Sequence, residues 1–221
     1  MGQIVLSGEP PVEITVKRSR RARRLSLRVS SLDGRVTLSV PAGLPERAAR
    51  AFAEEKAPWI RRHLSGHAAP TLATVGARLP VAGEPLEIRA GPVRAVRAEA
   101  GALWVPEARA DRAPALVGAW LKARARDALA EASDRHAAAL GLRYTRLSLR
   151  DTRSRWGSCS SEGRLMYSWR LIMAPAEVLD YVAAHEVAHL REMNHSPAYW
   201  AVVQELMPGF EAPRRWLREN G

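Results

Sequence analysis

Cysteine and long apolar runs are scarce in this chain of 221 residues, and both scarcities narrow the class of protein. The one cysteine, Cys159, has no partner within the chain, so the fold must hold without an internal disulfide, as in a reducing cytoplasm. No segment approaches the roughly 20 apolar residues that span a bilayer. The first residues, MGQIVLSGEPPVE, contain neither the basic nor the apolar region of a secretion signal. We therefore expect a cytoplasmic protein without a membrane segment.

Repeats and low-complexity tracts are also absent, and a composition of 47% hydrophobic and 26% charged residues is typical of a folded protein with a core. The charge is unbalanced, with a formal net charge of +11 and a dense basic segment, KRSRRARR, at residues 17–24. Such a segment attracts polyanions, and it equally protects the exposed edge of a strand from unwanted pairing. Nucleic-acid binding therefore stays open as a possibility.

The chain changes character near residue 108. Residues 1–108 contain short segments in which apolar and polar residues alternate, as in half-buried strands, with one helical pattern at residues 45–64. A long helical pattern then begins near residue 113. We expect an α+β fold with an N-terminal β-rich lobe and one helix over residues 1–108, followed by a second lobe over residues 109–221.

Turn chemistry predicts one hairpin in each lobe. In the first, the Asp-Gly pair at residues 33–34 separates strand patterns at residues 25–30 and 35–40. In the second, the Glu-Gly pair at residues 162–163 separates two further strand patterns, RSRWGSCSS and RLMYSWRLI. A helical pattern follows the second hairpin at residues 174–193 and contains the most informative motif of the chain.

That motif is HEVAHLREMNH, residues 185–195, which holds three of the six histidines. His185 and His189 are four residues apart, so on a helix they lie on the same face, one turn from each other, and can share one ion. Glu186 lies about 100° round the helix from His185. This places its carboxylate beside the ion without making it a natural direct ligand. The H-E-x-x-H arrangement has a glutamate in this position as the general base.

A catalytic zinc needs a third protein ligand and an open fourth position. His195 is the candidate, because Asn194 tolerates the conformation that ends helices and Ser196-Pro197 starts a new one, so His195 falls in the turn between them. Two other interpretations stay open. The histidines could belong to a polar helix face, or they could form a structural zinc site with Cys159 as the fourth ligand.

With these motifs the chain resembles the YgjP-like zinc metallopeptidases, which are related to the SprT and WLM groups of zincins. The resemblance is specific over residues 152–200 and softer over residues 18–60. It implies a zincin-like second lobe with a β-hairpin and an HExxH helix, one zinc ion held by the three histidines, and Glu186 as the catalytic glutamate. The histidine spacing is also that of metzincins, but Glu192 stands where those carry a glycine.

Peptide hydrolysis also needs a donor for the negative charge that develops on the carbonyl oxygen. Tyr181, one turn before the first histidine on the same face, offers a phenol, although a place in the core is equally consistent with its position. Arg153 and Arg155 offer guanidinium groups just before the hairpin. Tyr199 is a further phenol, but it shares an apolar stripe with its helical neighbours, which favours a place in the core.

Zincins commonly bind an extended substrate along a strand edge, where main-chain hydrogen bonds supply affinity. Gly157, inside the first strand pattern of the hairpin, permits close backbone approach there, and Trp156 either lines the cleft or belongs to the core. Glu192 is a candidate for orienting a ligand histidine, and it is equally well interpreted as a surface carboxylate. His136 lies on an apolar stripe and is interpreted as structural.

The sequence therefore predicts a zinc-dependent metallopeptidase that hydrolyses peptide bonds through a metal-activated water, with Glu186 as the general base. Two alternatives remain. One is a DNA-associated peptidase of the SprT kind, indicated by the basic segment at residues 17–24. The other is a zinc hydrolase of a non-peptide amide or ester, because the same ion and base attack any such carbonyl.

Overall fold

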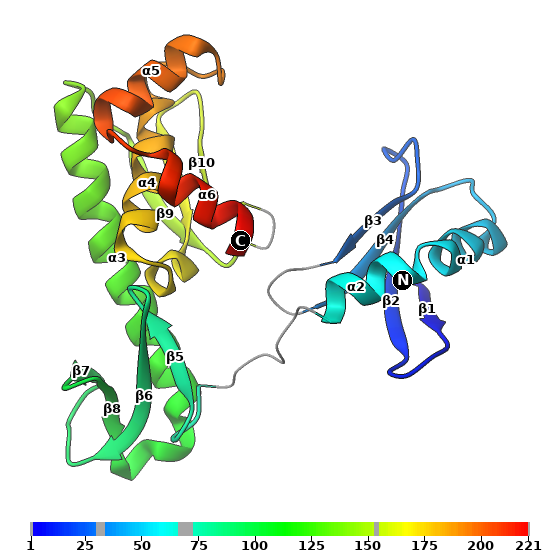
Figure 1. Cartoon of the computed structure of the whole chain (residues 1–221), viewed down its shortest axis with the longest axis horizontal. Helices are drawn as coiled ribbons and strands as arrows, with labels where there is room; N and C mark the ends of the chain where they lie inside the picture. Colours follow the sequence, from blue (N-terminus) through cyan, green and yellow to red (C-terminus); the bar gives the residue numbers. More distant parts are fainter. Residues whose placement is uncertain (1, 30–33, 66–72, 153–154, 221) are drawn as a thin grey trace. The chain divides into compact units, whose positions relative to one another are not determined.

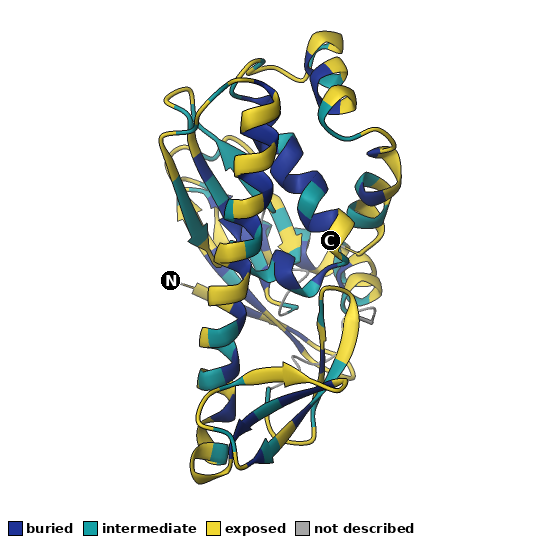
Figure 2. Ribbon diagram, turned by 90° about the vertical axis from the view of Figure 1, so that its left-hand side faces the viewer, coloured by how far each residue is buried: buried dark blue, intermediate teal, exposed yellow. Residues whose placement is uncertain are grey.

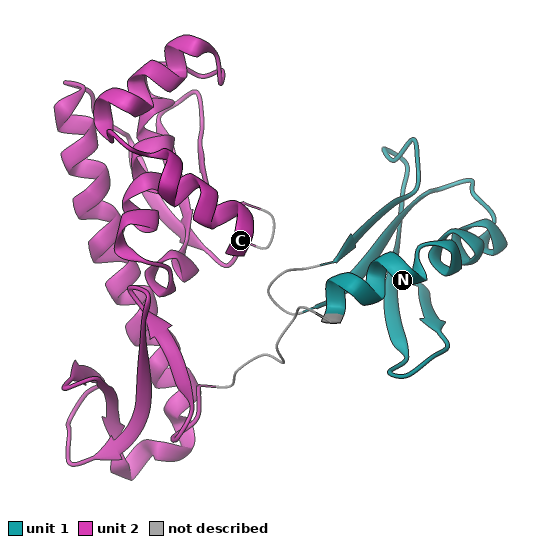
Figure 3. Ribbon diagram, viewed as in Figure 1, with its two compact units in different colours: residues 1–70 teal, residues 71–221 magenta. Residues whose placement is uncertain are grey.

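The protein is represented by a computed structural model, which describes residues 2–29, 34–65, 73–152 and 155–220. These residues form two compact units, Met1–Pro70 and Thr71–Gly221 (Figures 1 and 3). The division differs from the expected lobe boundary near residue 108. The reason is packing, because the strands between the two positions share a buried core with the helix that follows them.

Unit 1 is a four-stranded sheet with two helices. The strands lie in the order β1-β2-β4-β3, with β2 and β4 parallel and the outer pairs antiparallel. Ile14 and Leu38 from the sheet share a buried cluster with Ala53 and Ile60 from the helices. The elements of this unit are β1 (Gly2–Leu6), β2 (Val12–Ser19), β3 (Ser26–Val29), β4 (Val36–Pro41), α1 (Glu46–Glu55) and α2 (Ala57–Ser65).

Two predictions for unit 1 are confirmed in part. β3 pairs with β4 antiparallel, with Leu27 opposite Leu38, as the expected hairpin requires, although Asp33 of its turn lies outside the described residues. The helical pattern expected at residues 45–64 forms two helices with a break at Lys56. Pro58 lies in the first turn of α2, where a missing backbone N–H costs no hydrogen bond. The first strand, β1, was not predicted.

Unit 2 begins with a second four-stranded sheet, ordered β5-β6-β8-β7, and a long helix. Ile88 and Leu103 of this sheet belong to the same buried cluster as Val117 and Leu121 of the helix. The long helix, α3, is buried along one side and exposed along the other (Figure 2). This part comprises β5 (Arg78–Val81), β6 (Glu84–Gly91), β7 (Arg97–Glu99), β8 (Ala102–Pro106), the 3-10 helix η1 (Glu107–Arg112) and α3 (Ala113–Ala139).

The rest of unit 2 is a three-stranded sheet and three helices. Its strand order is β10-β11-β9, so β10 is an outer strand, and it pairs antiparallel with β11 as the second predicted hairpin requires. A buried hydrogen bond of 3.0 Å between Ser133 Oγ and the Tyr167 hydroxyl ties α3 to β11. These elements are β9 (Arg146–Arg150), β10 (Gly157–Cys159), β11 (Arg164–Ser168), η2 (Trp169–Met173), α4 (Ala176–Ala188), α5 (Pro197–Leu206) and α6 (Glu211–Asn220).

The fold is therefore a mixture of α-helices and β-sheets, as expected. Two bounds differ from prediction, because the second hairpin strand ends at Ser168 in a 3-10 helix and α4 ends at Ala188, five residues before the expected end. Among the helices of the described residues, none combines the length and the apolar character that a bilayer crossing requires.

Candidate metal centre

The three histidines of the motif are brought together by the end of one helix and the start of the next. His185 lies in the last turn of α4, and His189 is the residue that caps this helix. The chain then turns, and Ser196 begins α5 by accepting a hydrogen bond of 3.3 Å from the Tyr199 backbone N–H. His195 stands just before this cap, so the helix break predicted from the sequence is confirmed.

The ring nitrogens of the three histidines converge. The Nε2 atoms of His185 and His195 are 3.2 Å apart, and one ligand nitrogen from each of the three rings lies within 4.8 Å of the others. Two nitrogens bound to a tetrahedral zinc at about 2.0–2.1 Å lie roughly 3.3 Å from each other. The His185–His195 pair therefore fits a shared zinc ion.

Hydrogen bonding occupies one of the two ring nitrogens of His189. His189 donates from Nδ1 to the backbone carbonyl of Glu192 at 3.0 Å, which holds the ring and directs Nε2 toward the other two histidines. The sequence made the Glu192 side chain one candidate for this role. The backbone carbonyl takes it instead, because α4 ends at Ala188 and the following turn brings the main chain back over the ring.

Burial favours the neutral imidazole at two of the three histidines, His185 and His189. Burial lowers the pKa of His185 to about 3, and the neighbouring His189 and His195 act in the same direction. Burial also lowers the pKa of His189, although its hydrogen bond to the Glu192 carbonyl opposes this. A neutral imidazole has the lone pair that a metal ion needs, so burial favours the form of His185 and His189 that can bind a metal.

Glu186 is buried, with 5% of its surface exposed, and packs against the outer strand β10. A Cβ atom added to Gly157 would lie 2.5 Å from Glu186 Oε1 and 2.7 Å from its Cγ, so no larger residue fits there without movement. The close approach expected at Gly157 is thus occupied by Glu186. Whether a substrate backbone also runs along this strand stays a prediction.

Burial and two neighbouring groups act on the pKa of the Glu186 carboxyl. Burial raises the pKa of Glu186 to about 8, while the charge of Arg155 and a hydrogen bond from the backbone N–H of Cys159 oppose the rise. A cation beside the carboxyl would oppose it further, since nearby positive charge favours the carboxylate. Glu186 therefore stands where its charge responds strongly to what is bound next to it.

Cys159 does not join the histidine cluster. Burial, aided by the charge of Glu186, raises the pKa of its thiol to about 11, so it stays protonated near neutral pH. Its sulfur lies 3.4 Å from the Ser160 carbonyl oxygen, to which it donates. Cys159 is not among the residues whose ligand atoms converge with the three histidines. This counts against a structural zinc site with a fourth, sulfur ligand.

Tyr199 lies among the three imidazoles. It is fully buried, and its ring centroid is 5.3 Å from that of His185, 4.5 Å from that of His189 and 4.6 Å from that of His195. Its hydroxyl donates to the backbone carbonyl of His185 at 2.9 Å. The core position favoured for Tyr199 is confirmed. Its ring also packs against all three imidazoles, and the apolar stripe in the sequence did not indicate these contacts.

The other candidate donors are placed as follows. Tyr181 is buried, with its ring 5.8 Å from that of His185 and stacked on Phe210 at 6.1 Å. Arg155 is exposed, and its charge acts on Glu186. Arg153 lies outside the described residues.

Two further residues complete the list of sequence candidates. Trp156 is half-buried and packs against the core of unit 2, while its carbonyl accepts a hydrogen bond of 2.8 Å from the Ser168 N–H. His136 is buried and hydrogen-bonds to Asp180 at 2.8 Å, so its structural interpretation is confirmed. Trp156 thus belongs to the core, and its contact with substrate stays a prediction.

Arg214 was missed by sequence reasoning. It belongs to α6, a helix that the apolar pattern did not indicate, and its guanidinium lies 4.1 Å above the ring of Trp200. Its positive charge helps to lower the pKa of His185 and opposes the rise in the pKa of Tyr181, which burial causes. A fixed cation therefore lies close to the histidine cluster on the side of Tyr181.

A buried glutamate next to converging histidines is an arrangement suited to metal-dependent hydrolysis. The family model of the YgjP-like metallopeptidase domain matches residues 23–220, and the chain belongs to this family. It is therefore a metallopeptidase, a class of enzyme that uses a metal and acts on peptides. No curated protein matches the chain.

One solved structure is similar to part of the chain. It is the crystal structure of the metallopeptidase zymogen of Pyrococcus abyssi abylysin, which is 18% identical, with 41% of this chain and 92% of that chain covered. The TM-score is 0.38, and a similarity this low adds nothing to the assignment of the site.

Proposed function

We propose that this metallopeptidase is zinc-dependent, with the ion held by His185, His189 and His195 and with Glu186 as the general base. In this proposal the zincin-like part lies within residues 109–221. The observation that supports it most directly is the 3.2 Å separation of the His185 and His195 Nε2 atoms. The residue that follows His185 is the buried Glu186. Three imidazoles with a fourth position left open match the ligand set of catalytic zinc.

Zinc, when bound, supplies Lewis acidity, which polarises a peptide carbonyl and makes water more acidic. Glu186 accepts the proton from the attacking water and passes it to the leaving amine. The Cys159 N–H orients the Glu186 carboxyl by a hydrogen bond. The carboxyl also packs closely against Gly157, which has no side chain in the way. Tyr181 and Arg155 are the proposed donors to the oxygen that becomes negatively charged.

The substrate is proposed to lie along β10. Among the described residues this strand is the outer one of its sheet, so its outer edge can pair with an extended peptide. Because Gly157 of β10 touches Glu186, a peptide on this edge passes next to the general base. Trp156, just before the strand, would then flank the bound chain.

The test is the metal content of the purified chain, measured by plasma mass spectrometry together with cleavage of a casein substrate. We expect about one zinc per chain in the unchanged protein and in Glu186→Gln, which should bind metal but cleave nothing. His195→Ala should lose the zinc. His63→Ala, which removes an exposed histidine outside the cluster, is the matched control and should change neither property. Unchanged zinc in His195→Ala would show that the third ligand is assigned wrongly.

A second candidate, a DNA-associated peptidase, is favoured by one observation. Arg20, Arg21, Arg23 and Arg24 are exposed, and no carboxylate among the described residues pairs with them. If DNA is a partner, an oligonucleotide should bind with a steep salt dependence and should stimulate casein cleavage. Cleavage that stays the same with and without DNA at low salt would remove this candidate. A zinc hydrolase of other amides or esters would instead bind zinc and leave every peptide intact.

A further inference from the structure

The strand β3 forms one edge of the sheet in unit 1. The order β1-β2-β4-β3 places β4 on one side of it and leaves its other side without a partner strand among the described residues. Ser26 and Arg28 are exposed, while Leu27 and Val29 are half-buried and pack toward the helices. An edge of this kind presents backbone N–H and C=O groups to which an extended chain can pair.

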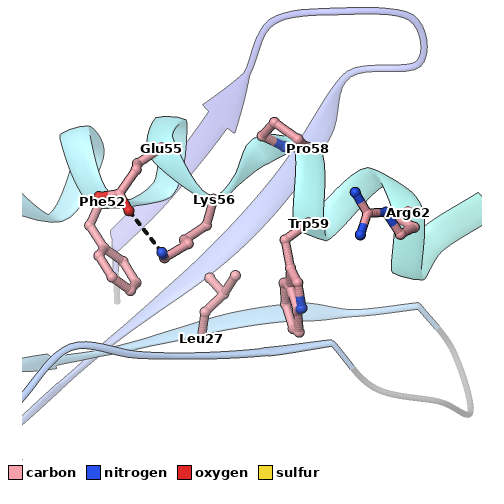
Figure 4. A pocket seen from close by; sticks show the side chains of 7 residues that line it. All are labelled: Leu27, Phe52, Glu55, Lys56, Pro58, Trp59 and Arg62. Carbon is pink, nitrogen blue, oxygen red and sulfur yellow. Dashed lines mark hydrogen bonds and ion pairs between the residues drawn. The ribbon is translucent and has the colours of Figure 1, made fainter.

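An open groove of about 530 Å³ runs between this strand and the two helices, and its size falls in the range of ligand-binding sites (Figure 4). Figure 4 shows the Trp59 side chain reaching from α2 toward the strand, with Phe52 on α1 at the other end and Leu27 between them. Trp59 keeps 38% of its surface exposed, which is unusual for a side chain of this size. The groove is lined by Leu27, Phe52, Glu55, Lys56, Pro58, Trp59 and Arg62.

The surroundings of the groove are positively charged. Residues 1–70 contain 13 basic and 6 acidic residues, a net charge of +7 out of +11 for the whole chain. Glu55, the acidic residue of the lining, is already paired with Lys56 at 2.7 Å. Arg23 and Arg24 are exposed just before β3 begins, and no carboxylate of the described residues pairs with them. An occupant with negative charge at that end is complementary to this surface.

A peptide fits these features better than a nucleic acid does. Only a peptide can continue the hydrogen-bonding pattern of the β3 edge. Single-stranded nucleic acids bind by stacking bases on open aromatic faces. Here the Trp59 ring already lies against His63, with the ring centroids 4.0 Å apart, and the Lys56 ammonium lies 5.7 Å from the centre of the Phe52 ring. Trp59 and Phe52 thus line the groove in an arrangement that suits an inserted peptide side chain better than a stacked base.

We propose that unit 1 binds an extended acidic peptide, which adds to β3 as a fifth strand. One large apolar side chain of this peptide enters the groove between Trp59 and Phe52, and its acidic residues lie beside Arg23 and Arg24. The inference rests on the proposed function in one respect, that peptides are the substrates. It assigns unit 1 the task of holding a substrate segment other than the one that is cleaved.

The test measures binding without cleavage, using the full chain carrying Glu186→Gln. The probe is a fluorescein-labelled peptide, Thr-Val-Thr-Leu-Thr-Val-Glu-Glu-Glu, followed by fluorescence anisotropy. Trp59→Ala should weaken binding at least about tenfold, and replacing the three glutamates with glutamine should weaken it and flatten its salt dependence. Val5→Ala removes a side chain of 50% exposure from β1, the opposite edge of the sheet, and should bind the peptide normally.

Strand addition is tested with two N-methylated forms of the peptide, each blocking alternate backbone N–H groups. One of them should lose binding at least about tenfold while the other binds normally, because alternate residues of a strand point their N–H groups to opposite sides. Equal binding of both forms and the parent, or no effect of Trp59→Ala, would overturn the proposal. A 20-nucleotide oligothymidine that competes with the peptide and binds more weakly to Trp59→Ala would assign the groove to nucleic acid instead. Since no cleavage is measured, a wrong zinc assignment leaves these outcomes unchanged.

Discussion

Gly157 and Glu186 are in such close contact that a single methyl group on the glycine would overlap the carboxyl, 2.5 Å from Oε1 and 2.8 Å from Cδ. The outer strand β10 and the helix α4 therefore approach each other through a position that tolerates only hydrogen. The same strand donates a backbone N–H, that of Cys159, to the carboxyl. Two separate contacts from one strand thus orient the proposed general base relative to the histidines.

The first prediction concerns this contact. Gly157→Ala should displace the Glu186 carboxyl and lower kcat for peptide cleavage about 100-fold, as a shift of about 1 Å in a catalytic group does. Zinc content should stay near that of the unchanged protein, because the three atoms nearest to the added Cβ all belong to Glu186. Gly118→Ala in α3 is the matched control, since its added Cβ meets nothing within 4 Å. Full activity in Gly157→Ala would mean that the position of Glu186 does not limit the reaction.

The second prediction concerns Tyr199. Tyr199→Phe removes only the hydrogen bond to the His185 carbonyl and should lower the free energy of unfolding by about 0.5–1.5 kcal/mol with zinc bound normally. Tyr199→Ala removes the ring among the histidines and should lower zinc affinity about 10–100-fold, the range seen when groups that orient metal ligands are lost. Competition with a fluorescent zinc chelator measures this affinity. Equal zinc affinity in the two variants would show that the ring does not support the site.

The third prediction separates two phenols. If Tyr181 donates to the developing oxyanion, Tyr181→Phe should lower kcat about 100–1000-fold while KM and zinc content change little. Tyr199→Phe serves as the matched control, because its hydroxyl is already engaged with the main chain and should leave kcat nearly unchanged. If Tyr181→Phe keeps its kcat, the donor must be sought elsewhere, with Arg155 and Arg214 as the next candidates.

The fourth prediction concerns pH and stability. Burial favours the neutral form of Asp180, but the hydrogen bond and charge of His136, together with Arg135, outweigh burial and lower the pKa of this carboxyl. A lowered folded-state pKa stabilises the fold above the unfolded-state value, about 3.9, and this contribution is lost as the pH falls through the folded-state value. At pH 7, Asp180→Asn should therefore lower the free energy of unfolding by about 1.5–3 kcal/mol.

Urea denaturation of the zinc-free chain measures this effect from pH 7 down to pH 2.5. The difference between the unchanged protein and Asp180→Asn should shrink below about pH 4. Asp111→Asn, at an exposed position of η1, is a suitable control and should show little difference at any pH. A difference for Asp180 that stays constant into acid would mean that the ion pair is not its source.

Local chemistry was enough for several elements of the fold. The four-residue spacing of buried positions in α3, the Asp-Gly turn signal between β3 and β4, and the Ser-Pro start of α5 each depend on interactions between residues that are near in sequence. The lobe boundary was misplaced for the opposite reason. Whether the strands β5–β8 join the first or the second unit depends on which distant apolar surface they bury, and alternation of apolar residues within each strand says nothing about that partner.

The candidate site divides in the same way. The positions of His185, Glu186 and His189 relative to one another follow from helix geometry. The end of the helix before His195 follows from Asn194 and Ser196-Pro197. These candidate residues could therefore be named from the sequence alone. The contact of Gly157 with Glu186 and the ring of Tyr199 among the imidazoles could not. They join segments from different elements, and such contacts depend on how a sheet edge, α4 and α5 pack together, which no local periodicity encodes.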